Sequence, residues 1–304
     1  MKFSLSKKNE RVSNSKKIAE LETHEEDQLE QNLVWIFASP RSGTQWLGTQ
    51  LLEHNTIICH GPSIGLNLGA LHGGFTDKIV RWIDFRGEES DYFLSKKYID
   101  QWTYFMRKFI LNRINLQYKD LTKKIIIPDP EGSIGGDFIA RCTPNSKFVL
   151  LLRDGRDVVD SVIDAGKPDS WHVKSRGVSP VTPKNRARRI AHASRRWVKQ
   201  TEILDEIYRY YGSNQCIQIK YENLRANTLE NLKKIYEFID VEISNDELNH
   251  IGKKYDFDKI PQEKKGSGKV TRSASPGKWK ENFSQEEQEI MNQIMNETLI
   301  KLGY

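Results

Sequence analysis

Short apolar segments alternate with longer amphipathic ones along most of this chain. LVWIFAS (33–39), KKIIIPDP (123–130) and KFVLLLRD (147–154) have the length and composition of buried strands. The first and the third lead into segments whose apolar residues recur at helical spacing, TQWLGTQLLEH (44–54) and RDVVDSVIDAG (156–166). This alternation predicts an α/β fold, in which a central parallel β-sheet is flanked by helices on both faces.

The rest of the pattern continues this alternation. Two further strands are expected at TIICH (56–60) and CIQIKYENL (216–224). Helices are expected over residues 91–118 (one or two), 187–212, 228–240 and 284–304. Two segments lack periodicity and are rich in Gly, Ser, Pro and basic residues. We interpret 166–189 as a mobile loop over a site, and 263–280 as a glycine-rich basic loop.

The first 31 residues differ from the rest in composition. They are rich in Lys, Glu, Asn and Ser and almost lack aromatic residues, which favours a disordered or loosely helical tail over 1–31. The folded domain is therefore expected over 32–304. A chain of 304 residues with 37% hydrophobic residues is long enough for one large domain of this kind.

Composition and charge narrow the class of protein only a little. No window reaches the ~18 apolar residues of a membrane span, and the N-terminal segment has no apolar core of a signal peptide, so we expect no membrane span and a cytoplasmic location. Cys59, Cys142 and Cys216 lack metal-ligand spacing, which fits a reducing compartment and predicts packing roles. The net charge of +6 is compatible with nucleic acid, an anionic surface or a polyanionic cofactor.

The segment SPRSGTQW (39–46) joins the first strand to its helix through a glycine turn. Gly43 permits a tight turn, and the amides of residues 42–46 would open a helix whose N-terminus attracts an anion. A Walker A loop also needs a Lys and a Ser or Thr after its last glycine, for the outer phosphates and magnesium. Here Arg41 precedes Gly43 and no Lys follows. Taken alone, the segment fits a phosphate loop and an ordinary turn equally well.

A second arginine repeats this arrangement after the fourth strand. Arg153 and Ser161 are eight positions apart, so a guanidinium at the strand end and a hydroxyl on the next helix can face one cleft. Arg offers a planar fork for phosphate oxygens and Ser a single hydrogen bond. In the alternative interpretation, Arg153 pairs with a nearby Asp and Ser161 only caps a turn. GKVTRSASPGKW (268–279) adds Arg272, which a solvated surface loop would also explain.

Together these elements resemble the sulfotransferases that use 3′-phosphoadenosine-5′-phosphosulfate (PAPS), over nearly all of residues 32–304. PRSGTQWL (40–47) is similar to the 5′-phosphosulfate loop of that family, and RDGRDVVDS (153–161) to its 3′-phosphate motif. GKWKENFS (277–284) resembles its closing G-x-W-K-x-x-F segment, and QIKYENL (218–224) the strand whose Tyr lies near the adenine. Any one motif is weak, but four in this order are specific.

The resemblance implies a P-loop-like sulfotransferase fold and transfer of a sulfuryl group from PAPS to a hydroxyl or amine, with no metal required. Arg41 would stabilise the leaving group, and Gln45 departs from the usual Thr. Members of the family have Arg-Lys-Gly before the closing G-x-W-K segment. This chain has RSA at 272–274, so only Arg272 matches. The residues to which the resemblance assigns cofactor binding are Arg41, Ser42, Gly43, Thr44, Gln45, Trp46, Arg153, Ser161, Tyr221 and Arg272.

The base that deprotonates the acceptor stays open between three residues. His60 ends the second expected strand, where an imidazole can project over the phosphate loop with a pKa suited to base catalysis. It can equally be a strand-end residue that is hydrogen-bonded to the backbone. Asp129 and Glu131 lie at the end of another strand and are its rivals. Either can instead cap a helix or pair with Arg141.

Two other classes of protein compete with this interpretation. A P-loop kinase or regulatory protein would need the missing G-K-[ST]. A nucleic-acid binder would use the basic segment PKNRARRIAHASRRW (183–197), but Trp197, Ile203 and Leu204 give this helix an apolar side, so we expect no nucleic-acid partner. Basic residues at 171–178 and 185–189 are compatible with an anionic acceptor, such as a carbohydrate, or with a small metabolite, but the same charges could serve only to reinforce the binding of PAPS. The pattern specifies no oligomeric state.

Overall fold

The computed structural model describes residues 21–59, 95–129, 134–256, 259, 261, 263, 266–269 and 276–304. Five parallel strands form one sheet in the order β2-β3-β1-β4-β5. The strands are β1 (Leu33–Ala38), β2 (Ile57–Cys59), β3 (Lys124–Asp129), β4 (Lys147–Leu152) and β5 (Cys216–Lys220). Because every pair is parallel, all carboxyl ends meet at one edge of the sheet. The predicted α/β fold with a central parallel sheet is confirmed.

The strands lack polar alternation because both faces of the sheet are covered. All six residues of β1 are buried. Trp35 and Phe37 pack into the core on one face, while Val34 and Ile36 pack into the core on the other. Strands buried on both sides are typical of parallel sheets, which explains the continuous apolar runs in the sequence.

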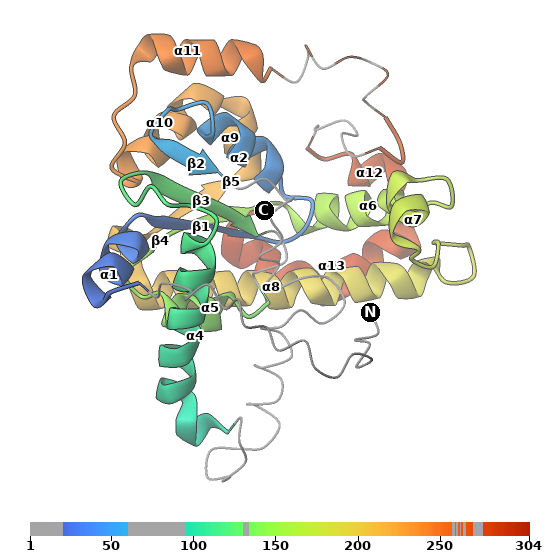
Figure 1. Ribbon diagram of the computed structural model, residues 1–304. Coiled ribbons are helices and arrows are strands. Elements are labelled where there is room, and N and C mark those ends of the chain that lie inside the picture. The colour runs from blue at the N-terminus through green and yellow to red at the C-terminus, as the bar shows by residue number, and fades with distance from the viewer. Residues whose placement is uncertain are drawn as a thin grey trace, which may run out of the picture.

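Two helical layers enclose the sheet (Figure 1). One face is covered by α2 (Thr44–Leu51), α9 (Tyr221–Ala226), α10 (Thr228–Phe238) and α11 (Asn245–Lys254). The other is covered by α1 (Thr23–Gln31), α4 (Ile99–Asn115), which follows the short η2 (Lys96–Tyr98), α5 (Gly136–Cys142) and the second half of α8 (Arg186–Gln215). In the part of the chain that the structure describes, no helix is long and apolar enough to cross a membrane.

A third apolar cluster extends the domain beyond the sheet. It joins the first half of α8 to α6 (Gly155–Ala165), α12 (Trp279–Asn282) and α13 (Gln285–Leu302). Trp197 of α8 and Met295 of α13 are buried in this cluster. The cluster holds α6, which follows β4 directly, against the end of the chain.

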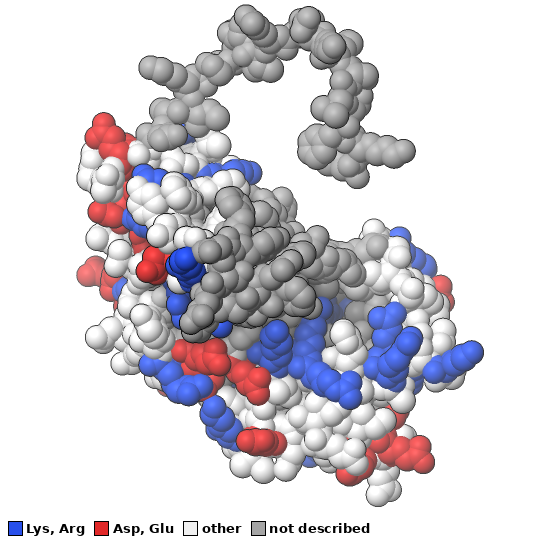
Figure 2. Space-filling model, turned by 90° about the horizontal axis from the view of Figure 1, so that it is seen from below, with Lys and Arg blue, Asp and Glu red and all other residues white. Residues whose placement is uncertain are grey.

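The basic segment at the start of α8 is an amphipathic helix, as expected. Ile190 and Trp197 are buried, whereas Arg188, Arg195 and Lys199 are exposed. Figure 2 shows several Lys and Arg side chains on the lower face of the molecule, the side on which α8 lies in Figure 1. The apolar side of this helix is therefore part of the core, and its basic side faces outward.

Two expected segment boundaries differ from the structure. The stretch 166–189 contains a short helix, α7 (Trp171–Arg176), which is capped by the Ser170 hydroxyl, and α8 begins before the stretch ends. The fifth strand ends at Lys220, so Tyr221 opens α9 rather than lying on a strand. A side-chain cap, that of Ser170, accounts for the start of α7, whereas α8 and α9 begin without one.

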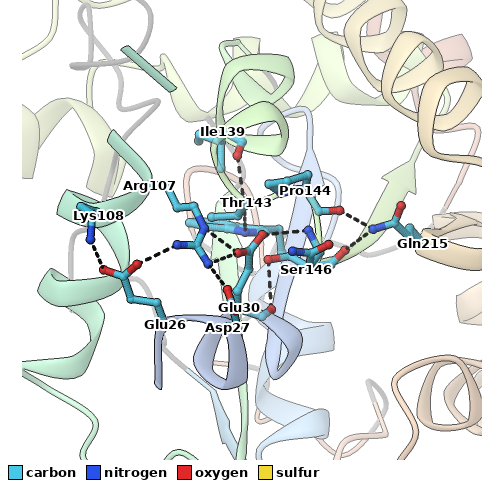
Figure 3. Close-up of polar contacts among 12 residues, drawn as sticks. Glu26, Asp27, Glu30, Arg107, Lys108, Ile139, Thr143, Pro144, Ser146 and Gln215 are labelled. Carbon is cyan, nitrogen blue, oxygen red and sulfur yellow. Dashed lines mark hydrogen bonds and ion pairs between the residues drawn. The ribbon is translucent and has the colours of Figure 1, made fainter. Parts of the chain in front are cut away.

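Packed structure begins before the boundary expected at Asn32, because residues 23–31 form α1. Leu29 and Glu30 of this helix are fully buried. The acidic residues that resemble a tail in the sequence are paired with α4 (Figure 3). Arg107 donates to Glu30 at 2.7 Å and to Glu26 at 2.8 Å, and Lys108 donates to Glu26 at 3.1 Å.

The carboxylates of Glu26 and Glu30 in this ion cluster are nearly removed from water, whereas the side chain of Lys108 is 37% exposed. Glu26 is 2% exposed and Glu30 0%. The second carboxylate oxygen of Glu30 accepts from the backbone N–H of Asn145 at 2.8 Å, just before β4 begins. The cluster therefore fastens α1 and α4 at the amino edge of the sheet, opposite the edge where the strands end.

We predict that Arg107→Met lowers the free energy of unfolding by ~3–5 kcal/mol, because it leaves buried carboxylates without their main partner. The matched control is Lys234→Met, which removes the exposed 2.6 Å pair with Glu230 and should cost about 0.5 kcal/mol or less. Urea unfolding at pH 7 measures both. Equal midpoints for the two variants would show that the buried cluster does not hold the amino edge.

Candidate functional site

The site lies where the connections of β1 and β4 diverge. These strands are neighbours, and Ala38 pairs with Leu151, so the segments after them emerge at the same edge. The chain leaves β1 towards β2 on one side of the sheet and leaves β4 towards β5 on the other. In open α/β sheets, such a divergence leaves a crevice at the carboxyl edge where ligands bind.

The loop after β1 is shaped to receive an anion. Arg41 and Gly43 both have positive φ, 70° and 90°. Between them the buried hydroxyl of Ser42 lies 3.0 Å from that of Ser39, which closes the loop on itself. Gly43 is the N-cap of α2 and has no capping side chain. An anion can take the place of the missing cap, because the first amides of a helix point outward from its N-terminus.

Only glycine fits at position 43. A Cβ atom there would lie 2.7 Å from Cε2 of Tyr221, besides requiring an unfavourable backbone conformation. Tyr221 is 5% exposed. Its burial raises the pKa of the phenol, and the Arg153 charge opposes this shift. The Tyr221 ring therefore forms a neutral wall beneath the loop.

The Arg153 guanidinium lies over this ring. Its Cζ is 4.5 Å from the Tyr221 ring centroid, and its Nη1 donates to the backbone carbonyl of Arg41. The side chain is buried, yet its Nε has no hydrogen-bond partner. Within the described ranges no carboxylate forms an ion pair with it. A buried guanidinium with an unused donor is suited to bind an anion.

Among the described residues neither nearby aspartate forms an ion pair with Arg153, the alternative that the sequence left open, although Oδ1 of Asp157 is buried without a hydrogen-bond partner. Asp154 caps α6 and pairs with Arg156 at 2.7 Å. Asp157 accepts from the backbone N–H of Gly277 at 2.7 Å. Burial raises the pKa of Asp157, although its hydrogen bond from Gly277 and the charge of Arg153 oppose this shift.

Ser161 completes the arrangement from the second turn of α6. It is 6% exposed, and its Oγ accepts from Nε of Arg41 at 3.0 Å. The loop after β1 and the helix after β4 are therefore in direct contact. The structure brings together Arg41, Arg153 and Ser161, the three side chains on which the sequence analysis placed its anion sites.

The aromatic side of the site is formed by Trp46 of α2. Its Nε1 donates to the backbone carbonyl of Tyr255 at 3.2 Å, which fixes the indole. The Arg225 guanidinium lies 5.3 Å from the ring centroid. Thr44 is buried in the first turn of α2, whereas Gln45 is exposed.

Several predicted residues are not placed by the structure. His60, Glu131 and Arg272 lie outside the described residues. Asp129 is described only by its backbone, as the last residue of β3. The choice of the base among His60, Asp129 and Glu131 stays a prediction.

Two side chains hold the Arg153 backbone in place, and the sequence alone assigned neither of them a role at the site. Nε1 of Trp197 donates to the Arg153 carbonyl at 3.2 Å. Glu222 accepts from the next backbone amide, that of Asp154, at 3.0 Å. The sequence marked Trp197 only as part of an apolar helix face. Glu222 lies within the motif QIKYENL, but the motif does not indicate its contact with Asp154, which lies 68 positions away.

Comparison with known proteins identifies the class. The model of the sulfotransferase family matches residues 34–245, and the chain belongs to this family. The predicted class of enzyme, a sulfotransferase, is thereby confirmed over the P-loop kinase alternative. The protein-tyrosine sulfotransferase of Drosophila melanogaster is 25% identical over 228 residues, 73% of this chain and 40% of that protein.

A second relative and a solved structure agree with this assignment. Protein-tyrosine sulfotransferase 2 of Gallus gallus is 24% identical over 228 residues, 73% of this chain and 54% of that protein. The chain thus spans about half the length of these two relatives. The structure of mouse sulfotransferase SULT7A1 complexed with PAP superposes with a TM-score of 0.55 at 15% identity, over 88% of this chain and 85% of that one. It has the same fold.

We predict that Gly43→Ala is more destabilising than Gly177→Ala. Both glycines have positive φ, but a Cβ at Gly177 meets nothing within 4 Å. Gly177→Ala should therefore cost only the backbone strain, ~1–2 kcal/mol. Gly43→Ala should cost ~1–3 kcal/mol more, because it also displaces the Tyr221 ring. Urea unfolding measures both free energies. The additional cost of Gly43→Ala over Gly177→Ala should shrink in a Tyr221→Ala background. An unchanged excess would contradict this contact.

Proposed function

We propose that this sulfotransferase transfers the sulfuryl group of PAPS to a tyrosine hydroxyl of a polypeptide. The observation that carries the proposal is the contact of Arg41 with Ser161 and of Arg153 with the Arg41 carbonyl. It joins two anion sites on neighbouring strand-helix units. PAPS carries phosphate at two ends of one ribose, so its binder needs two such sites at a fixed separation.

Each part of PAPS has a place in this arrangement. The N-terminus of α2, with Ser42 and Thr44, receives the 5′-phosphosulfate. Arg153 and Ser161 receive the 3′-phosphate, which gives the unused Arg153 Nε an acceptor. Trp46, fixed through its indole nitrogen, offers a flat surface for the adenine. The mouse neighbour was solved with PAP, the product of the donor, which supports the same nucleotide here.

The chemistry follows from charge and position. The acceptor oxygen attacks sulfur in line, a new S–O bond forms, and the S–O bond to the 5′-phosphate breaks. Negative charge then builds on the bridging oxygen as PAP leaves. Arg41 keeps its positive charge at any physiological pH and can stabilise this oxygen. The proton of the acceptor goes to the base, for which His60 is our first candidate and Asp129 and Glu131 are the others.

The nature of the acceptor rests on the relatives, which are named protein-tyrosine sulfotransferases. A phenol is a hydroxyl acceptor, one of the two acceptor groups, hydroxyl or amine, that the sequence analysis expected, and we place it on a polypeptide instead of a carbohydrate or small metabolite. The cytoplasmic location remains a proposal as well. It is supported by Cys142 and Cys216, which are free and buried. Burial raises the pKa of the Cys216 thiol to about 12.

The proposal predicts transfer from labelled PAPS to a peptide with a single Tyr, and none to the same peptide with Phe.

It also predicts that PAP raises the melting temperature far more than AMP at equal concentration, because AMP lacks the 3′-phosphate. A ligand at a hundredfold excess over its Kd stabilises by ~2.7 kcal/mol. Thermal shift and label transfer together measure both halves of the proposal.

Variants separate the two phosphate sites. Arg153→Ala should weaken PAP binding by ~1.5–3 kcal/mol and Ser161→Ala by less, and both should weaken AMP binding less than PAP binding. Arg188→Ala, at an exposed position of α8, is the control. Equal stabilisation by AMP and PAP would contradict the two-site assignment. Strong PAP binding, with transfer only to saccharide hydroxyls or to amines, would contradict the polypeptide acceptor but would leave the two-site assignment intact.

A further inference from the structure

The peptide bond between Arg153 and Asp154 is held at both of its polar atoms by side chains. The Arg153 carbonyl accepts from Nε1 of Trp197 at 3.2 Å, and the Asp154 N–H donates to Oε1 of Glu222 at 3.0 Å. This peptide lies after the end of β4 and before the first residue of α6. Its orientation is thus set by α8 on one side and by α9 on the other.

The Glu222 carboxylate is itself held from behind. Its other oxygen, Oε2, accepts from the hydroxyl of Tyr304 at 3.0 Å. Tyr304 follows α13, and its backbone N–H bonds to the Leu299 carbonyl at 3.0 Å. The Lys220 ammonium lies 4.6 Å from the Tyr304 ring centroid. Both oxygens of Glu222 are therefore engaged, and the phenol that holds one of them is fixed at its backbone and at its ring.

Burial and the charges around Tyr304 keep its phenol in one protonation state. Burial raises the pKa of the Tyr304 phenol, and the neighbouring Glu222 and Asp154 charges raise it further, with Arg153 in opposition. The hydroxyl therefore stays protonated and remains a donor to Glu222. A buried phenol without such an acceptor would lose the free energy of that hydrogen bond.

We propose that Glu222, held in place by Tyr304, is a positioning residue for the nucleotide site. It fixes the peptide plane that follows Arg153 and so directs the guanidinium across the Tyr221 ring toward the 3′-phosphate. The inference rests on the proposed function, because it assumes that Arg153 binds that phosphate. It gives Glu222 and Tyr304 a role at the site that the sequence analysis did not assign, and it joins the segment after α13 to nucleotide selectivity.

The expected effect is a loss of selectivity, not of all binding. A planar guanidinium forms its paired hydrogen bonds only in one orientation, so a small rotation of the peptide weakens the 3′-phosphate contact. The 5′-phosphate is bound by the loop after β1 and by the amides of α2. Nucleotides without a 3′-phosphate should therefore be nearly insensitive to Glu222.

The experiment measures Kd for PAP and AMP by calorimetry with the full chain and four variants. Glu222→Ala should raise Kd for PAP by about tenfold and Tyr304→Phe by about threefold, each with less than a twofold change for AMP, as expected for one lost hydrogen bond. Glu222→Gln should be milder than Glu222→Ala, because its amide oxygen can still accept from Asp154. Tyr210→Phe, at a tyrosine that is 79% exposed, is the matched control.

A second comparison separates positioning from general stability. In an Arg153→Ala background, Glu222→Ala should no longer change Kd for PAP. A persistent effect there, or equal losses for PAP and AMP, would overturn the inference. If the wild-type chain prefers PAP over AMP and both Glu222→Ala and Tyr304→Phe keep that preference, the inference fails while the proposed function stands. A wild-type chain without this preference would overturn both.

Discussion

The hydrogen bond from Arg41 to Ser161 is the contact on which the site depends. It crosses from the loop after β1 to the helix after β4, and the bond from Arg153 to the Arg41 carbonyl runs beside it. Such a contact is possible because β1 and β4 are parallel neighbours, so both segments leave the same edge of the sheet. The separation of the two anion sites is therefore set by strand pairing and not by flexible loops.

The two edges of the sheet serve different purposes. At the carboxyl edge Arg41 has positive φ and Arg153 is buried with an unused donor, features that cost ~1–3 kcal/mol each. At the amino edge the buried carboxylates of Glu26 and Glu30 are fully paired with α4. The strain at Arg41 and the unused donor of Arg153 thus lie where a ligand can bind, as expected of a functional site.

The sequence was informative where function or burial produces a local pattern. The apolar run of β4 and the spacing of Arg153 and Ser161 predicted both the strand and the site. The packing of α1 was not predicted, because its acidic face resembles a solvated or loosely helical tail until Arg107, about 80 residues away, pairs with it. The role of Glu222, which lies within the motif QIKYENL, was not predicted for the same reason: its partner Tyr304 is 82 positions distant, and long-range pairs leave no periodicity.

The central claim is that the loop after β1 and the helix after β4 form one binding unit. The most direct test is a double-mutant cycle for PAP binding with Arg41→Ala, Ser161→Ala and the double variant. Residues in one hydrogen-bonded network show coupling energies of ~0.5–3 kcal/mol. We expect a coupling in this range, with the second substitution costing less than the first. Additive losses, within about 0.3 kcal/mol, would show that the two anion sites act independently and would contradict this account.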